Sequence, residues 1–137
     1  MLADSNILVY AINIRSPKHK TAKQFLSREV GNLTIADQNI LESLRILTHP
    51  KFSPLPLSME DAVDALMAIV KNSRVIHPDY KTRDIALEFV KRSNLVADQV
   101  FDAYLAATAL SNGINIIATD NVKDFQKFPI KVLNPFS

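Results

Sequence analysis

One stretch near the end of the chain, from Ala97 to Phe125, constrains the fold most. It contains a helix-like run of small apolar residues that opens near Asp102 and closes at Gly113. A short apolar segment, 115–118, follows at once and leads into Asp120. A helix that is followed directly by a strand is typical of α/β folds, in which strand ends and helix starts meet at one edge of the sheet. We therefore expect the two carboxylates to lie at that edge.

Short apolar segments alternate with helical segments along the rest of the chain. The alternation predicts one α/β domain spanning residues 1–137, with a short, mostly parallel central sheet flanked by helices. The segment 7–12 is too short for its apolar pattern to distinguish a helix from a strand. We expect strands at 33–36, 74–76, 115–118 and 130–133, and a minimal first strand at 1–3. We expect helices that begin near Ser16, Asp37, Ser58 and Lys81, and a stiff linker at Pro54 and Pro56.

Composition excludes several classes of site. The chain has no cysteine, which rules out disulfides, thiolate zinc sites and cysteine nucleophiles. Two glycines are too few for a phosphate-binding glycine loop. The net charge of +2 permits a nucleic-acid partner without requiring one. No apolar stretch approaches the roughly 20 residues that span a bilayer, and the first residues do not resemble a signal peptide. We expect a soluble, cytoplasmic protein without a membrane partner.

Two further acids, Asp4 and Glu42, form a candidate cluster with Asp102 and Asp120. Asp4 follows the first predicted strand, and Glu42 lies within a predicted helix. Each also has a simpler interpretation, Asp4 as a helix cap and Glu42 as an exposed residue paired with Arg45. Carboxylates crowded at one sheet edge repel one another unless a cation or protons neutralise them. The cluster therefore predicts a site for Mg²⁺ or Mn²⁺, which prefer oxygen ligands.

Three other acids near the predicted cluster are less favoured as metal ligands. Asp98 lies four residues before Asp102 and is interpreted as a helix cap or a loop acid. Asp37 is interpreted as the cap of the helix that carries Glu42. Asp124 is either an acid that supports the site or a turn residue.

Four segments in order resemble the PIN-domain family, and within it the VapC-type toxins of toxin–antitoxin pairs. LADSNILVYA (2–11) resembles the first strand of the family, its first metal-binding acid and the Asn that follows. NILESLRIL (39–47) resembles the helix that carries the second acid. FDAYLAATALSNGINIIATDNVKDF (101–125) resembles the most characteristic segment, and FPIKVLNPF (128–136) resembles the closing strand. The resemblance covers almost the whole chain and implies an α/β/α sandwich.

The resemblance implies a metal-dependent endoribonuclease whose ion is held by acids. Many relatives end the site with Thr-x-Asp-x-Asp-Phe, whereas this chain reads TDNVKDF over 119–125. The fourth acidic position is therefore Asp120, Asn121 or Asp124, and Asp120 is the first choice. In this interpretation the catalytic and metal-binding residues are Asp4, Glu42, Asp102 and Asp120, and the supporting residues are Asn6, Thr119, Asn121, Asp124 and Asp98.

The resemblance also implies partners. The substrate is RNA, and Arg45, Lys123 and Lys127 are candidates for holding its phosphates. A small antitoxin protein is expected to cover the cleft and insert an arginine among the acids. A homodimer is also expected, with the helices around 7–26 and 62–70 as candidate surfaces.

Three alternatives compete with the nuclease. The first is a binding scaffold with the same fold and a degenerate site, which the altered 119–125 run favours. The second is a receiver-like phosphoacceptor, but this class needs an acidic neighbour beside Asp4. The third is a phosphatase with an aspartyl nucleophile, but its second acid would stand where this chain has Asn6.

Overall fold

The computed structural model describes residues 1–52 and 55–137, so Pro54 of the expected linker lies outside the described residues. Within them, five short strands form one sheet in the order β3-β2-β1-β4-β5, and every neighbouring pair is parallel. This arrangement confirms the predicted α/β fold with a parallel sheet. The strands are β1 (Leu2–Ala3), β2 (Thr34–Ala36), β3 (Arg74–Ile76), β4 (Ile116–Ala118) and β5 (Lys131–Leu133).

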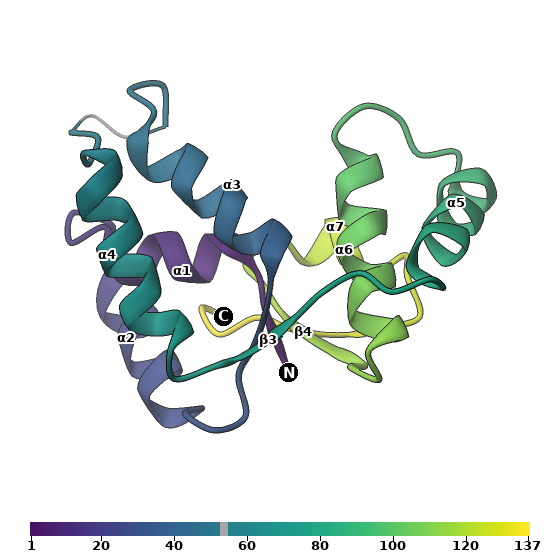
Figure 1. The fold of residues 1–137 in the computed structure, drawn as a ribbon, viewed down its shortest axis with the longest axis horizontal. Helices are drawn as coiled ribbons and strands as arrows, with labels where there is room; N and C mark the ends of the chain where they lie inside the picture. The colour runs from purple at the N-terminus through teal and green to yellow at the C-terminus, as the bar shows by residue number, and fades with distance from the viewer. Residues whose placement is uncertain (53–54) are drawn as a thin grey trace.

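Helices cover both faces of the sheet. In Figure 1, α1 to α4 gather on one side of the strands and α5 to α7 on the other. Among the described residues, no helix is long and apolar enough to cross a membrane. The helices are α1 (Ser5–Ile12), α2 (His19–Arg28), α3 (Asp37–Thr48), α4 (Met59–Val70), α5 (Thr82–Ser93), α6 (Gln99–Ser111) and α7 (Val122–Phe125).

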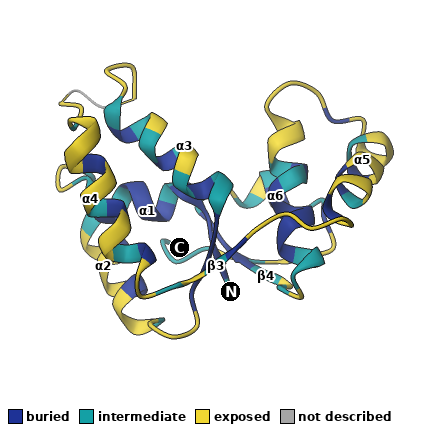
Figure 2. Cartoon of the chain, in the orientation of Figure 1, coloured by how far each residue is buried: buried dark blue, intermediate teal, exposed yellow. Residues whose placement is uncertain are grey.

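Strand alternation divides the apolar residues into two cores. Ala3, Ile35 and Ala118 pack with α1, α2 and α4, whereas their strand neighbours Leu2, Ala36 and Ile117 pack with α5 and α6. Successive side chains of a strand point to opposite faces, so β1, β2 and β4 each supply both cores. Figure 2 shows this buried layer where the helices meet the strands. The alanines of α6 are fully buried, as expected for close helix packing.

The structure tests three of the predicted helix starts, and a side chain caps one of them. Ser58 caps α4, as predicted, because its Oγ accepts a hydrogen bond from the Asp61 N–H at 3.1 Å. The prediction that Asp37 caps α3 is wrong, since Ala36 occupies the cap position and Asp37 lies in the first turn. The predicted start near Ser16 is early, because the Ser16 Oγ instead accepts from the Lys18 N–H in a turn before α2.

Candidate functional site

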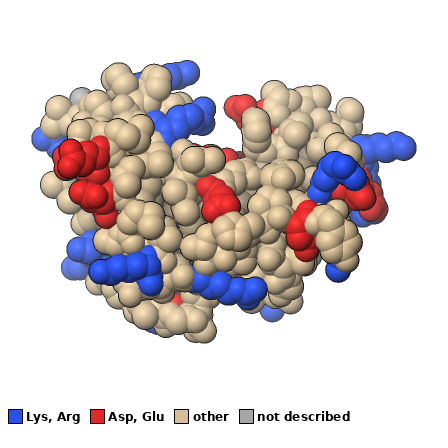
Figure 3. Space-filling view, in the orientation of Figure 1, with Lys and Arg blue, Asp and Glu red and all other residues tan. Residues whose placement is uncertain are grey.

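A cleft of about 730 Å³ opens between α3 and α6, where β1, β2 and β4 end. Figure 3 shows a notch between the two groups of helices, with acidic side chains in it. Three of the four predicted acids, Asp4, Glu42 and Asp102, line the cleft. The apolar side chains of Leu41 and Phe101 also line it and are 67% and 59% exposed. The fold therefore brings acids from three distant parts of the sequence to one opening.

Asp4 is the most deeply buried of these acids. It follows β1 and takes the cap position of α1, and it is only 5% exposed. Its Oδ1 accepts from the Ser5 N–H at 2.7 Å, and its Oδ2 accepts from Thr119 at 2.7 Å and Asn6 at 2.9 Å. Burial raises the pKa of Asp4, although the hydrogen bonds from Thr119 and Ser5 act in the opposite direction. Asp4 is therefore both a helix cap and a cleft residue.

Glu42 is held through both carboxylate oxygens. Its Oε2 accepts from the Ser5 hydroxyl at 2.9 Å, and its Oε1 accepts from the Gln38 Nε2 at 2.9 Å. The same Ser5 hydroxyl lies 3.3 Å from the Asp4 Oδ1, so a single serine connects the two acids. The simpler interpretation of Glu42, exposed and paired with Arg45, does not match this geometry.

Asp102 faces these two acids from the first turn of α6. Burial, together with the smaller effects of the negative charges of Asp124 and Asp4, raises its pKa to about 7, and Lys127 acts in the opposite direction. A carboxyl group with such a pKa is about half protonated at neutral pH. Burial makes the charged form of Asp102 costly, and the nearby acids Asp124, Asp4 and Glu42 add to that cost.

The structure differs from the expectation that Asp120 completes the acidic pocket. Its carboxylate forms an ion pair with Lys18 and accepts from the Tyr10 hydroxyl at 3.0 Å. Burial alone would raise the pKa of Asp120, but the hydrogen bonds from Lys18 and Tyr10 lower it overall. Asp120 is not among the residues that line the cleft. Its carboxylate is instead bound by Tyr10 of α1 and by Lys18, which directly precedes α2.

The other predicted site residues divide into three groups. Asn121 and Asp98 line the cleft and are exposed. Asp124 does not line it but acts on the charge of Asp102. Thr119 is fully buried, and its Oγ1 connects Asp4, Asn6 and the Asn121 N–H. Of the predicted positive residues, Arg45 lines the cleft, Lys127 acts on Asp102, and Lys123 is exposed on α7.

Two residues that the sequence reasoning did not place in the site are central to it. Ser5 connects Asp4 to Glu42, and Gln38 connects Glu42 to α6. A signal existed for Gln38, because it lies four residues before Glu42 on a helix, the spacing at which side chains meet. Ser5 gives no comparable signal. Its bond to Glu42 spans 37 residues of sequence, which no local pattern reports.

Asp4, Glu42 and Asp102 are the acids of the cleft that could hold a divalent ion. Within residues 1–52 and 55–137, no three acidic, histidine or cysteine side chains stand close enough together to enclose a metal ion. Mg²⁺ is commonly bound by one or two carboxylates together with several waters, so it does not need such an enclosure. The hydrogen-bonded oxygens of Asp4 and Glu42, with the charge-crowded Asp102 opposite, supply oxygen ligands of the kind that Mg²⁺ and Mn²⁺ prefer.

Residues 1–131 match the family model of the PIN domain. The chain belongs to the PIN-domain family. Ribonuclease VapC48 of Mycobacterium tuberculosis is 32% identical over 146 residues, which cover 98% of this chain and 96% of that protein. Ribonuclease VapC37 of the same species is 28% identical over 135 residues, which cover 93% of this chain and 90% of that protein. The predicted resemblance to PIN domains of the VapC type is confirmed.

Solved structures agree with the fold of this PIN domain. A chain of the toxin–antitoxin complex from Klebsiella pneumoniae is similar with a TM-score of 0.70 and 22% sequence identity. The match covers 98% of this chain and 96% of that chain. At this level of identity the likeness establishes the shared fold.

Proposed function

We propose that this PIN domain is a metal-dependent endoribonuclease that acts as the toxin of a toxin–antitoxin pair. The observation that carries the proposal is the convergence of Asp4, Glu42 and Asp102 on one cleft. The relatives VapC48 and VapC37 are ribonucleases by name, which supports RNA as the substrate. The exposed Phe101 and Leu41 also support it, because unpaired bases stack on apolar and aromatic side chains.

Asp4 and Asp102 would bind Mg²⁺ or Mn²⁺, and Glu42 would bind the ion or orient the attacking water. When bound, the ion lowers the pKa of water and stabilises charge that develops on the phosphate. The Asp120 carboxylate already binds Lys18 and the Tyr10 hydroxyl. Asn121 and Asp124 are therefore the remaining candidates for the fourth residue of the site. Water that attacks phosphorus in line breaks the bond to the 3′-oxygen, which leaves a 5′-phosphate and a 3′-hydroxyl.

The test is cleavage of a mixed pool of structured and single-stranded RNA. We expect cutting in Mg²⁺, no cutting in excess EDTA, and 5′-phosphate ends on the products. Folding of the EDTA-treated protein is checked by circular dichroism. Equal cutting with and without EDTA, or products with 2′,3′-cyclic phosphate ends, would contradict the proposal.

Metal affinity should depend on pH through Asp102. Its pKa of about 7 means that a proton competes with the ion below neutral pH. We expect the affinity for Mg²⁺ to fall roughly tenfold per pH unit below pH 7 and to level off above pH 8. Calorimetric titration in two buffers with different ionisation enthalpies should show proton release on binding at pH 6. A flat affinity between pH 6 and pH 8 would rule out this role for Asp102.

Arg45 should contribute to RNA binding from the wall of the cleft. We expect Arg45→Ala to weaken binding of single-stranded RNA and to reduce the slope of log affinity against log salt by about 1. Binding is measured by fluorescence anisotropy in EDTA, so that the RNA stays intact. The matched control is Lys20→Ala, which removes one exposed charge on α2. If both variants lower the slope equally, Arg45 has no special role.

Partners of this PIN domain are also part of the proposal. An antitoxin protein would cover the acidic cleft, and an arginine of that protein would neutralise its charge. A homodimer would use the exposed apolar residues of α4, among them Val63 and Met67, which are 38% and 49% exposed. The other expected dimer surface, 7–26, supplies Ile7, Leu8 and Phe25 to the core, which leaves these three side chains out of any interface.

A binding scaffold with a degenerate site is the second candidate function. The observation that favours it is Asp120, which pairs with Lys18 outside the cleft. A scaffold should bind RNA or a protein partner without cutting RNA in any metal. RNA bound by the folded protein, with no cleavage in Mg²⁺ or Mn²⁺ and no metal binding, would favour the scaffold over the nuclease.

A further inference from the structure

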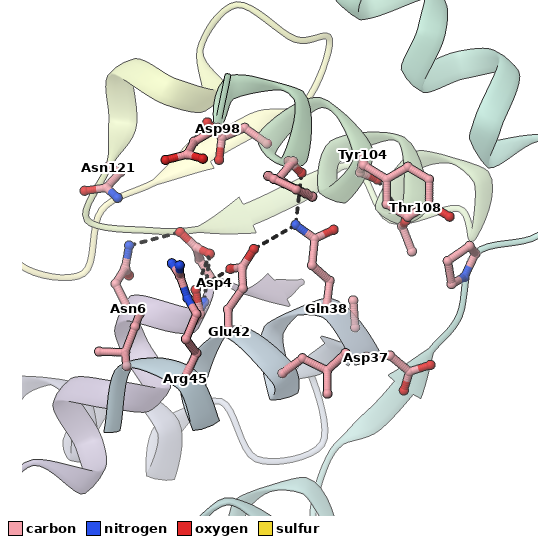
Figure 4. Close-up of a pocket in the computed structure, with 17 residues that line it drawn as sticks. Asp4, Asn6, Asp37, Gln38, Glu42, Arg45, Asp98, Tyr104, Thr108 and Asn121 are labelled. Atoms are coloured by element: carbon pink, nitrogen blue, oxygen red, sulfur yellow. Dashed lines mark hydrogen bonds between the residues drawn. The ribbon is translucent and has the colours of Figure 1, made fainter. Parts of the chain in front are cut away.

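Gln38 bridges the two walls of the cleft. It lies on α3, and its Nε2 donates to the Glu42 Oε1 at 2.9 Å and to the backbone oxygen of Phe101, on α6, at 3.0 Å. Figure 4 shows Gln38 beside Glu42, with dashed lines that run from its nitrogen. Phe101 directly precedes Asp102, so this one amide touches an acid on one wall and the backbone beside an acid on the other.

The chemistry of these partners fixes the orientation of the amide. A carboxylate and a backbone carbonyl are acceptors only, so the nitrogen of Gln38 must face both of them. The amide group has two N–H bonds, and each partner takes one. Among the described residues, the buried Gln38 Oε1 has no hydrogen-bond partner. The side chain is therefore held by its donors alone, at the middle of the cleft.

The bridge opposes a force that the acids create. Glu42 belongs to the α1–α4 group and Asp102 to the α5–α7 group, and the negative charge of Glu42 contributes to the raised pKa of Asp102. Like charges on opposite walls favour a wider cleft. A neutral double donor between them attaches the walls to each other without adding charge. Together with Ser5, it makes a continuous connection from Asp4 through Glu42 to the first turn of α6.

We propose that Gln38 is a positioning residue that sets the spacing of Glu42 and Asp102 across the cleft. This inference rests on the proposed metal-dependent function. Gln38 holds Glu42 in one orientation and keeps α6 at a fixed distance, which would let acids of both walls hold one ion. Groups that orient metal ligands from outside typically change metal affinity or activity by 10–100-fold when they are removed.

The test compares Gln38→Met with the wild-type protein. Methionine has similar length and cannot donate to either partner. We expect Mn²⁺ affinity, measured by calorimetry, to fall at least about tenfold and the kcat for RNA cleavage to fall with it, with KM little changed. Gln38→Glu is the second variant and should lose at least as much, because it adds a charge beside Glu42. The matched control is Gln24→Met, at an exposed position of α2.

The outcomes separate the inference from the function on which it rests. Wild-type affinity and kcat in a folded Gln38→Met protein would overturn the role of Gln38 and leave the nuclease intact. A folded wild-type protein that neither binds Mn²⁺ nor cuts RNA would overturn the proposed function and the inference with it. A thermal midpoint for Gln38→Met near the wild-type value, together with the loss of metal affinity, would support positioning over a general role in stability.

Discussion

Asp102→Asn should abolish RNA cleavage and, in the absence of metal, make the protein more stable. The loss of activity should be at least about 100-fold. Removal of a group that only orients a metal ligand costs 10–100-fold, and removal of a ligand itself should cost more. The side chain keeps its size, so the shape of the cleft is retained. The cleavage rate in saturating Mg²⁺ is the measurement, and a loss below about tenfold would contradict the role of Asp102 as a ligand.

The expected gain in stability follows from the pKa of Asp102. Its folded-state value of about 7 lies above its ordinary value of 3.8, so the folded protein holds this proton more tightly than the unfolded chain. The contribution of this group to stability is full below pH 4 and is lost as the pH rises through 7. Asparagine has no charge to lose, so at pH 8 the variant should gain about 1 kcal/mol, since half-exposure screens the larger cost.

Urea unfolding in EDTA measures this gain at two pH values. At pH 8 the Asp102→Asn midpoint should exceed that of the wild type, and at pH 4 the two midpoints should coincide. A variant that is less stable than the wild type at pH 8 would show that Asp102 is paired in the metal-free state. Saturating Mg²⁺ should reverse the order at pH 8, because only the wild type binds the ion tightly.

Phe125→Ala should produce the largest loss of stability. Phe125 is 1% exposed, and its ring lies 6.3 Å from that of Phe128 in the core beneath α6. Truncation of a buried phenylalanine costs about 3–5 kcal/mol, through lost burial and the cavity that remains. Phe125 also anchors α7, which carries Asp124, so metal affinity should fall as well.

The free energy of unfolding in urea measures the effect of Phe125→Ala. The matched control is Leu87→Ala on α5, where the leucine is 59% exposed and its loss should change stability by no more than about 0.5 kcal/mol. A Phe125→Ala cost as small as that of the control would mean that α7 is not fixed by this side chain.

The sequence predicted most of the fold, because local signals govern it. Short apolar segments separated by helices required a parallel sheet, and Ser58 marked a helix start that the structure retains. The segment 7–12 could not be assigned from six residues; in the structure it belongs to α1, which Asp4 caps and which packs against α2, α3 and α4. The early start predicted at Ser16 reflects a serine that caps a turn and lies three residues before the helix.

The candidate site was predictable where it depends on strand ends and helix starts. Asp4 and Asp102 have such positions, and the fold brings them to the same cleft. Asp120 also follows a strand, but its carboxylate pairs with Lys18, which lies 102 residues away in sequence. No local pattern shows that a lysine of another element reaches this carboxylate. The hydrogen bond from Gln38 to Phe101 likewise joins residues 63 apart in sequence and depends on how α3 and α6 are placed.

Titration of Mn²⁺ into the metal-free protein is the most direct test of whether these acids form a metal site. Calorimetry at pH 8 should show saturable binding to the wild type, loss of that binding in Asp4→Asn, and retention of it in Asp120→Asn, whose wild-type carboxylate pairs with Lys18. No binding to the folded wild type, or equal binding by wild type and Asp4→Asn, would contradict a catalytic ion held in the cleft.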